Sequence, residues 1–128
     1  MSRTPVVRPQ THPGATKTDG AIRPRVAETF DFRDILYTKA DGIARVTLNR
    51  PERYNAYTTD TLAELGEAFR DAAFDDAVGV LVLTGAGTKA FCTGGDVKEY
   101  ADTYVRRPRE YWKYMSLFVE AHDRLRNL

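Results

Sequence analysis

Two adjacent glycines, Gly94 and Gly95, are the residues of this chain whose chemistry can be inferred most directly. They follow an apolar run with strand character, residues 78–84, and precede residues 96–99, which are typical of the start of a helix. Because glycine has no side chain, its backbone amide can approach a ligand closely, and the start of a helix favours negative charge. The pattern therefore predicts a site that stabilises an oxyanion, such as the enolate or tetrahedral form of a thioester carbonyl. The alternative is a strand-to-helix turn that needs glycine only for a positive φ.

A second segment lies upstream and supports the first. Residues 46–57 combine the end of a predicted strand with the sequence Asn49-Arg50-Pro51 and, after a short gap, Asn55-Ala56. Together with residues 90–99, in this order and with one predicted helix and one strand between them, the segment resembles the enoyl-CoA hydratase/isomerase (crotonase) family. The resemblance covers about residues 35–128. Within the family, residues 33–37, 54–60 and 92–101 are most similar to the 6-oxocyclohex-1-ene-1-carbonyl-CoA hydrolases.

The resemblance implies roles for individual residues. Gly95 would supply one of two backbone amides that bind the thioester oxygen, and its neighbours would line the same pocket: Thr93, Gly94, Asp96 and Val97. The upstream loop would contact coenzyme A through Arg53, Asn55, Ala56 and Tyr57. Two of these residues have a plain structural alternative, since Asp96 can cap the following helix and Arg53 can be a solvated surface charge.

The fold class predicted from the pattern is α/β, and the resemblance makes it the N-terminal part of a crotonase-type (ββα)n spiral fold, incomplete. Asp41-Gly42 between two β-prone runs predicts a hairpin. A helix is expected over residues 60–74, with Thr58, Thr59 and Asp60 as candidate caps and Thr61 and Glu64 at capping-box spacing. A buried central strand is expected over 78–84. Pro108 suits the first turn of a last helix with an apolar stripe of core residues. Residues 1–30, rich in Pro and Gly, predict a flexible tail before the domain at 31–128.

Composition excludes several classes of function. A net charge of +1 gives no strong field for nucleic acid, and no apolar run approaches the roughly 20 residues that span a bilayer. One cysteine, Cys92, excludes an internal disulfide and indicates a cytoplasmic protein. With His12 and His122 far apart, no metal-ligand spacing exists, so we expect no metal and no cofactor other than the coenzyme A of the substrate. Family trimers or hexamers are expected only of a completed chain.

Three further patterns have structural explanations. Cys92 lacks a nearby basic partner and is expected to be a buried thiol rather than a nucleophile. His122 falls on the apolar stripe and is expected to be packed there. Residues 85–90 fit the dinucleotide fingerprint G-x-G-x-x-A, but residues 91–95 delay the helix that the fingerprint requires at its glycines.

The sequence thus predicts the acyl-CoA thioester-binding portion of a crotonase-family enzyme, either an enoyl-CoA hydratase/isomerase or a ring-opening hydrolase. The alternative is a truncated, inactive fragment that binds coenzyme A weakly or docks to a full-length paralogue. On either reading the partner is an acyl-CoA thioester, with no nucleic acid and no membrane.

Overall fold

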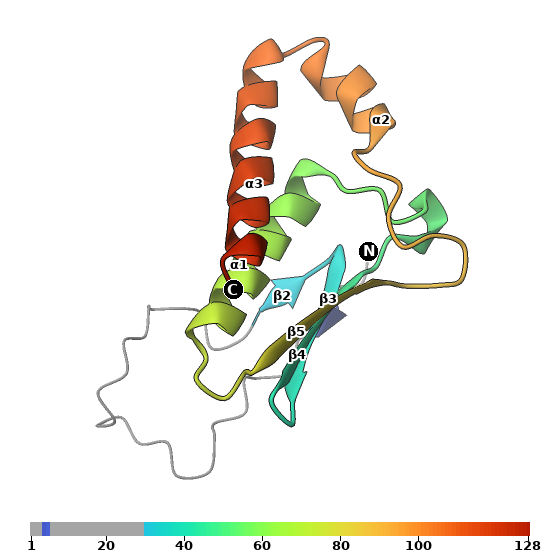
Figure 1. Cartoon of the computed structure of the whole chain (residues 1–128). Helices are drawn as coiled ribbons and strands as arrows, with labels where there is room; N and C mark the ends of the chain where they lie inside the picture. Colours follow the sequence, from blue (N-terminus) through green and yellow to red (C-terminus); the bar gives the residue numbers. More distant parts are fainter. Residues whose placement is uncertain (1–3, 6–29) are drawn as a thin grey trace.

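The computed structural model describes residues 4–5 and 30–128 (Figure 1). The predicted flexible tail over residues 1–30 lies almost wholly outside the described residues. The described chain forms, in order, β1 (Thr4–Pro5), β2 (Asp31–Phe32), β3 (Ile35–Ala40), β4 (Ile43–Leu48), the 3₁₀-helix η1 (Pro51–Arg53), α1 (Thr59–Phe74), β5 (Val80–Gly85), α2 (Val97–Glu99), the π-helix η2 (Tyr100–Tyr104) and α3 (Pro108–Arg126). This is a mixed α/β fold, as predicted.

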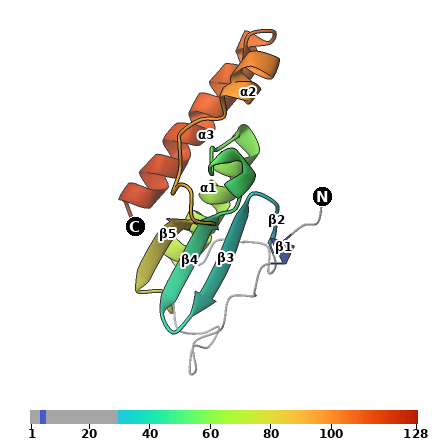
Figure 2. The same cartoon turned by 90° about the vertical axis from the view of Figure 1, so that its right-hand side faces the viewer.

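The main sheet has the strand order β3-β4-β5. The predicted hairpin is present, since β3 pairs antiparallel with β4 across Asp41 and Gly42, which have φ values of 54° and 79°. β5 then runs parallel to β4, and α1 makes the crossover. In Figure 2 the strands lie side by side, and the two long helices lie to one side of them. A two-residue pairing of β1 with β2 stands apart from this sheet.

Alternation along β4 decides which face of the sheet is covered. Ala44, Val46 and Leu48 are buried, whereas Ile43 and Arg45 are exposed. The buried face packs on the apolar stripe of α1, which includes Leu62, Leu65, Ala68 and Phe69. α3 packs against α1 rather than on the sheet, so the cavity described below forms beside α3.

A buried charged network joins β3 to the end of α1. Lys39 is 5% exposed, and its Nζ lies 2.6 Å from Asp71 Oδ2 and 2.6 Å from Asp75 Oδ2. The Tyr37 hydroxyl donates to Asp71 at 2.7 Å. Burial, with the neighbouring Asp71 carboxylate, raises the pKa of Tyr37. Each charge in this network therefore has a partner, as a buried charge requires.

Three expectations need correction. β5 was predicted to be a buried central strand, but it pairs only with β4 among the described strands, and Val80 is 57% exposed. Apolar character on both faces does not bury a strand that has a neighbour on one side only.

The capping box of α1 is formed by Thr58 and Thr61, not by Thr61 and Glu64. His122 is exposed, with Nδ1 2.7 Å from the Phe118 carbonyl oxygen, although Ala121 and Leu125 in the same turns of α3 contact the core.

Candidate active site

The loops of the candidate site are held together by one buried side chain, Asn55. Its Oδ1 accepts a hydrogen bond from the Arg50 amide at 3.0 Å. Its Nδ2 donates to the carbonyl oxygens of Ala86 at 2.9 Å and Ala90 at 2.8 Å. Asn55 is 1% exposed and has a φ of 57°, a left-handed conformation that Asn tolerates better than most residues. Asn55 therefore ties the loop after β4 to the loop after β5, and its side chain is not exposed to a ligand.

Arg50 joins the same loop to the glycine segment. Its guanidinium donates to the Ala56 carbonyl oxygen and, at 3.0 Å, to Asp96 Oδ2. The other carboxylate oxygen of Asp96 accepts from the amides of Lys98 at 2.9 Å and Glu99 at 3.3 Å. Burial alone would raise the pKa of Asp96, but these hydrogen bonds and the Arg50 charge outweigh it and lower the pKa. Asp96 is thus an ionised helix cap with both oxygens engaged.

Gly95 forms a parallel bridge with Tyr57. The Tyr57 amide donates to the Gly94 carbonyl oxygen at 3.0 Å, and the Asp96 amide donates to the Tyr57 carbonyl oxygen at 2.9 Å. This pattern uses the amides of Tyr57 and Asp96 and leaves the Gly95 N–H out. Across residues 30–128, no hydrogen bond to another protein group is found for that N–H. It is a free backbone donor, which an oxyanion site requires.

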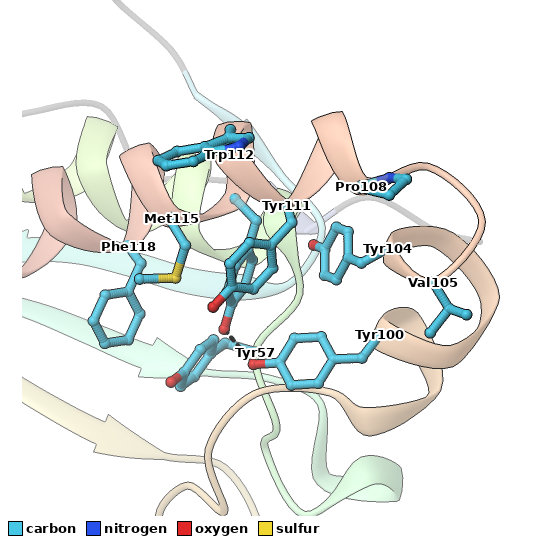
Figure 3. A pocket seen from close by; sticks show the side chains of 10 residues that line it. Tyr57, Tyr100, Tyr104, Val105, Pro108, Tyr111, Trp112, Met115 and Phe118 are labelled. Atoms are coloured by element: carbon cyan, nitrogen blue, oxygen red, sulfur yellow. Dashed lines mark hydrogen bonds between the residues drawn. The ribbon is translucent and has the colours of Figure 1, made fainter.

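A cavity of ≈ 760 Å³ lies on the α3 side of this bridge (Figure 3). It is lined by apolar and aromatic side chains from η2, α3, the turn between them and the bridge residue Tyr57: Tyr57, Tyr100, Tyr104, Val105, Pro108, Tyr111, Trp112, Tyr114, Met115 and Phe118. Gly95 adjoins this lining, because a Cβ built on it would lie 1.9 Å from the Tyr100 hydroxyl and 2.9 Å from that of Tyr114. A side chain at position 95 is therefore excluded by the lining itself.

Three tyrosines of the lining keep their protons at neutral pH. Burial is the main cause of the raised pKa of Tyr57 and Tyr114, and the hydrogen bond with Tyr100 raises that of Tyr114 further. Burial and the Glu99 carboxylate raise the pKa of Tyr104, whose hydroxyl donates to Glu99 at 2.5 Å. The cavity is therefore neutral, with hydroxyl groups that can donate hydrogen bonds.

The structure brings some of the predicted site residues together. Tyr57, Gly94, Gly95 and Asp96 meet at the bridge, and Gly94 has the positive φ, 102°, that its position in the pair requires. Ala56 is buried beneath them, 8% exposed, and offers its carbonyl oxygen to Arg50.

Other predicted residues lie on the outer surface. Arg53 is exposed and has no ion pair within the described part of the chain. Thr93 is exposed, and its hydroxyl donates to the Tyr54 carbonyl oxygen at 3.3 Å. Val97 is 74% exposed. Cys92 is half-buried and packs against the core, which agrees with a structural thiol.

Sequence reasoning missed three residues of this arrangement. Arg50 was part of the motif but had no assigned role. Its side chain is only 16% exposed, and a charge that is largely removed from solvent calls for an anionic partner. Tyr100 and Tyr114 were noted only as residues shared with the hydrolases that the chain resembles, whereas they line the cavity. The recurrence of tyrosine at 100, 104, 111 and 114 was the available signal.

One physical argument for the site also needs correction. The dipole of a helix beginning near Asp96 was expected to favour an anion, but α2 has three residues and continues directly into the π-helix η2. Its first amides already donate to Asp96. The Gly95 amide is not used in this cap and remains a donor for a ligand.

Searches for other kinds of site gave negative results for the described residues. No helix in this part of the chain is long and apolar enough to cross a membrane. Nor do the described residues contain a group of three or more His, Cys, Asp or Glu side chains that could hold a metal ion.

Comparison with known proteins identifies the family. The family model for enoyl-CoA hydratase/isomerase matches residues 38–125. The 6-oxocyclohex-1-ene-1-carbonyl-CoA hydrolase of Geobacter metallireducens is 40% identical over 130 residues, covering 92% of this chain and 34% of that protein. The enzyme of the same name from Thauera aromatica is 49% identical over 73 residues, covering 57% of this chain and 19% of that protein.

Solved structures agree with the sequence comparison. An enoyl-CoA hydratase/carnithine racemase from Magnetospirillum magneticum superposes with a TM-score of 0.67 at 36% identity, over 75% of this chain and 36% of that one. The chain thus spans well under half the length of the relatives that it matches. The predicted resemblance to the family and to the ring-opening hydrolases is confirmed. On these matches, the chain belongs to the enoyl-CoA hydratase/isomerase (crotonase) family.

Proposed function

We propose that this chain is the acyl-CoA thioester-binding portion of a crotonase-family enzyme, with Gly95 as an oxyanion-hole donor. The single observation that carries the proposal is the free Gly95 amide beside a large cavity lined by aromatic side chains. A backbone N–H in such a position binds the carbonyl oxygen more strongly as negative charge develops on it. The lining matches an acyl group, because ligand pockets are mostly apolar with a few placed polar groups.

The reaction that we favour within the family is that of a ring-opening hydrolase of the 6-oxocyclohex-1-ene-1-carbonyl-CoA type. The relatives in Geobacter and Thauera that carry this name support the choice. Flat tyrosine faces around the cavity suit a flat ring better than an extended alkyl chain. Enoyl-CoA hydration or isomerisation remains the broader family alternative.

Coenzyme A would lie along the outer edge of the same loops. Arg53 is an exposed guanidinium, and such a group binds phosphate well. Thr93, Gly94 and Val97 flank Gly95 on the exposed side and would contact the pantetheine chain, mainly through their backbone. Asn55 and Ala56 would act indirectly, since they hold the loop that carries Tyr57.

The proposal can be tested at the level of one atom. The chain has nine glycines, so ¹⁵N-glycine labelling gives a spectrum in which the Gly95 amide can be followed. We expect this amide to move downfield on titration with an acyl-CoA thioester. A thioether analogue without the carbonyl oxygen should leave it in place. The proposal is wrong if the amide does not respond, or if it responds equally to the thioether.

A second candidate function is binding without turnover by this chain alone. The hydrogen bonds of Asp96, the carboxylate nearest to Gly95 in sequence, favour this function. One of its oxygens accepts from Arg50 and the other from the amides of Lys98 and Glu99. A carboxylate in this state is a poor general base. Thioester binding without product formation in an assay of the isolated chain would support this role, and measurable hydration or ring opening would refute it.

A further inference from the structure

Two tyrosine hydroxyls lie together at the point where the cavity meets Gly95. The hydroxyl oxygens of Tyr100 and Tyr114 are 2.6 Å apart, the contact drawn as a dashed line in Figure 3. Both lie within 3 Å of the place that a Cβ on Gly95 would occupy. A thioester held by the Gly95 amide would therefore have its acyl group next to this pair.

The pair stands out from the rest of the lining. Val105, Pro108, Met115 and Phe118 offer no strong hydrogen-bonding group, and the Tyr104 hydroxyl is already bound to Glu99. The lining also holds the hydroxyls of Tyr57 and Tyr111 and the indole N–H of Trp112, so the pair is distinguished by its position beside Gly95. An apolar acyl group would cover the hydroxyls there without offering them a partner, which costs free energy.

The pair also has a proton to donate. Two hydroxyls that share one hydrogen bond have one further O–H between them, and either tyrosine can be the one that carries it. Tyr114 is 2% exposed and contacts the rings of Tyr57, Tyr100, Tyr104, Tyr111 and Phe118. Its hydroxyl is therefore held in place before any ligand binds, as a specific polar contact requires.

We propose that the Tyr100–Tyr114 hydroxyl pair determines acyl specificity by donating a hydrogen bond to an oxygen substituent on a ring-shaped acyl group. This inference rests on the proposed function, since it assumes that the thioester oxygen binds at Gly95. A site built to hydrogen-bond a ligand oxygen discriminates strongly against the analogue without that oxygen. An apolar pocket discriminates much less against an analogue that carries an extra hydroxyl. The pair would therefore select oxygenated cyclic acyl groups over plain ones.

The π-helix η2 explains how the pair is formed. Tyr100 and Tyr104 stand at its two ends, and the Glu99 carboxylate just before it accepts from the Thr59 amide at 2.9 Å. This contact anchors η2 to the start of α1, so that the Tyr100 hydroxyl reaches Tyr114 on α3. Single π-helical turns occur often at functional sites, where they direct a side chain that a regular helix would not.

The test is calorimetric titration of the full chain with three ligands. These are 6-oxocyclohex-1-ene-1-carbonyl-CoA, cyclohex-1-ene-1-carbonyl-CoA and free coenzyme A. We expect the oxygenated thioester to bind at least about tenfold more tightly than the plain ring. Tyr114→Phe should remove this preference, because it weakens binding of the oxygenated thioester and relieves the cost of covering the hydroxyl with the plain ring. Tyr100→Phe should reduce the preference. Tyr111→Phe is the matched control, because Tyr111 lines the same cavity but its hydroxyl is not part of the pair.

The outcomes separate the two proposals. If both thioesters bind more tightly than coenzyme A but with equal affinity, the specificity proposal is wrong and the proposed function stands. The specificity proposal also fails if Tyr114→Phe lowers the affinity for both thioesters by the same factor. The hydroxyl would then support the fold, or bind a part that both thioesters share. If no thioester binds more tightly than free coenzyme A, both proposals fail. A thermal melt of each variant identifies loss of fold, and Tyr100→Phe keeps the test valid if Tyr114→Phe does not fold.

Discussion

Replacing Gly95 by alanine is the perturbation that tests the arrangement of the site most directly. The added Cβ would lie 1.9 Å from the Tyr100 hydroxyl oxygen and 2.7 Å from the ring carbon that carries it. Ordinary contact begins at 3.4 Å, so the Tyr100 ring has to move. It cannot move freely, because it packs against the rings of Tyr104 and Tyr114, each with its centroid 5.5 Å away.

The expected cost follows from two parts. Forcing extra volume into a packed region destabilises a protein by about 1–3 kcal/mol. Displacing Tyr100 also breaks its 2.6 Å hydrogen bond to Tyr114, which is worth about 0.5–1.5 kcal/mol. Gly95→Ala should therefore lower the free energy of unfolding by about 2–4 kcal/mol. Gly66→Ala is the control, since a Cβ on Gly66 in α1 meets nothing within 4 Å and should stabilise the helix by about 0.5–1 kcal/mol.

Urea unfolding followed by far-UV circular dichroism measures both variants. A double-mutant cycle makes the assignment specific, because Tyr100→Ala removes the two atoms nearest to the added Cβ. In that background Gly95→Ala should cost at least about 1 kcal/mol less than in the natural chain. If the two substitutions are additive, or if Gly95→Ala is as well tolerated as Gly66→Ala, Tyr100 does not pack on Gly95 and the geometry argued for the site is incorrect.

Three further predictions concern the residues that support the site and the core. Asn55→Ala leaves three part-buried backbone groups without their side-chain partner and should cost about 2–3 kcal/mol in urea unfolding; a loss below about 1 kcal/mol would contradict its role in tying the loops. Because the pKa of Asp96 is lower in the folded state, its stabilising effect is present above the unfolded pKa near 3.8 and is lost as pH falls through the folded value. Asp96→Asn should therefore be less stable at neutral pH and should show a shallower loss of stability in acid; an unchanged acid limb would refute this. Lys39→Met leaves the buried Asp71 and the half-buried Asp75 without their shared cation and should cost about 3–5 kcal/mol, and additional removal of Asp71 should recover part of that loss.

The features predicted correctly from sequence are those that depend on neighbouring residues. The hairpin at Asp41-Gly42 and the start of α3 at Pro108 each follow from a backbone preference of one or two residues. The alternation along β4 was also predicted, since one face of a strand is covered and the other is not. The family motifs then gave the order of strand, helix and strand.

The features that were missed depend on residues far apart in the chain. Glu64 was expected to cap α1, but its carboxylate oxygens accept hydrogen bonds from the amides of Arg33 at 2.7 Å and Asp34 at 2.8 Å. Those partners precede it by about thirty residues, so no local pattern could reveal them. The Thr58 hydroxyl takes the capping position because the helix begins at Thr59.

The apolar stripe of α3 shows a different limit. Helical spacing identifies the face that turns inward, but it does not show whether the space on that face is filled. Tyr114 is 2% exposed, whereas Tyr111 on the same stripe is 46% exposed and Trp112 beside it is 75% exposed. The stripe therefore serves partly as core and partly as the wall of a cavity. Which residues of the stripe belong to the core and which line the cavity depends on where η2 lies relative to α3, and helical spacing does not give that position.

The electrostatics of the site also differ from those that the motif suggested, and the difference identifies a positioning residue. An oxyanion at the Gly95 amide would lie near the ionised Asp96 carboxylate, which by itself would oppose it. Arg50 neutralises that carboxylate across 3.0 Å, and the amides of Lys98 and Glu99 share the remaining charge. In the proposed function, the loop after β4 therefore does more than approach coenzyme A. By supplying Arg50, it makes the negative charge of the helix cap compatible with an anion at the neighbouring glycine, which explains why the two motifs must act together.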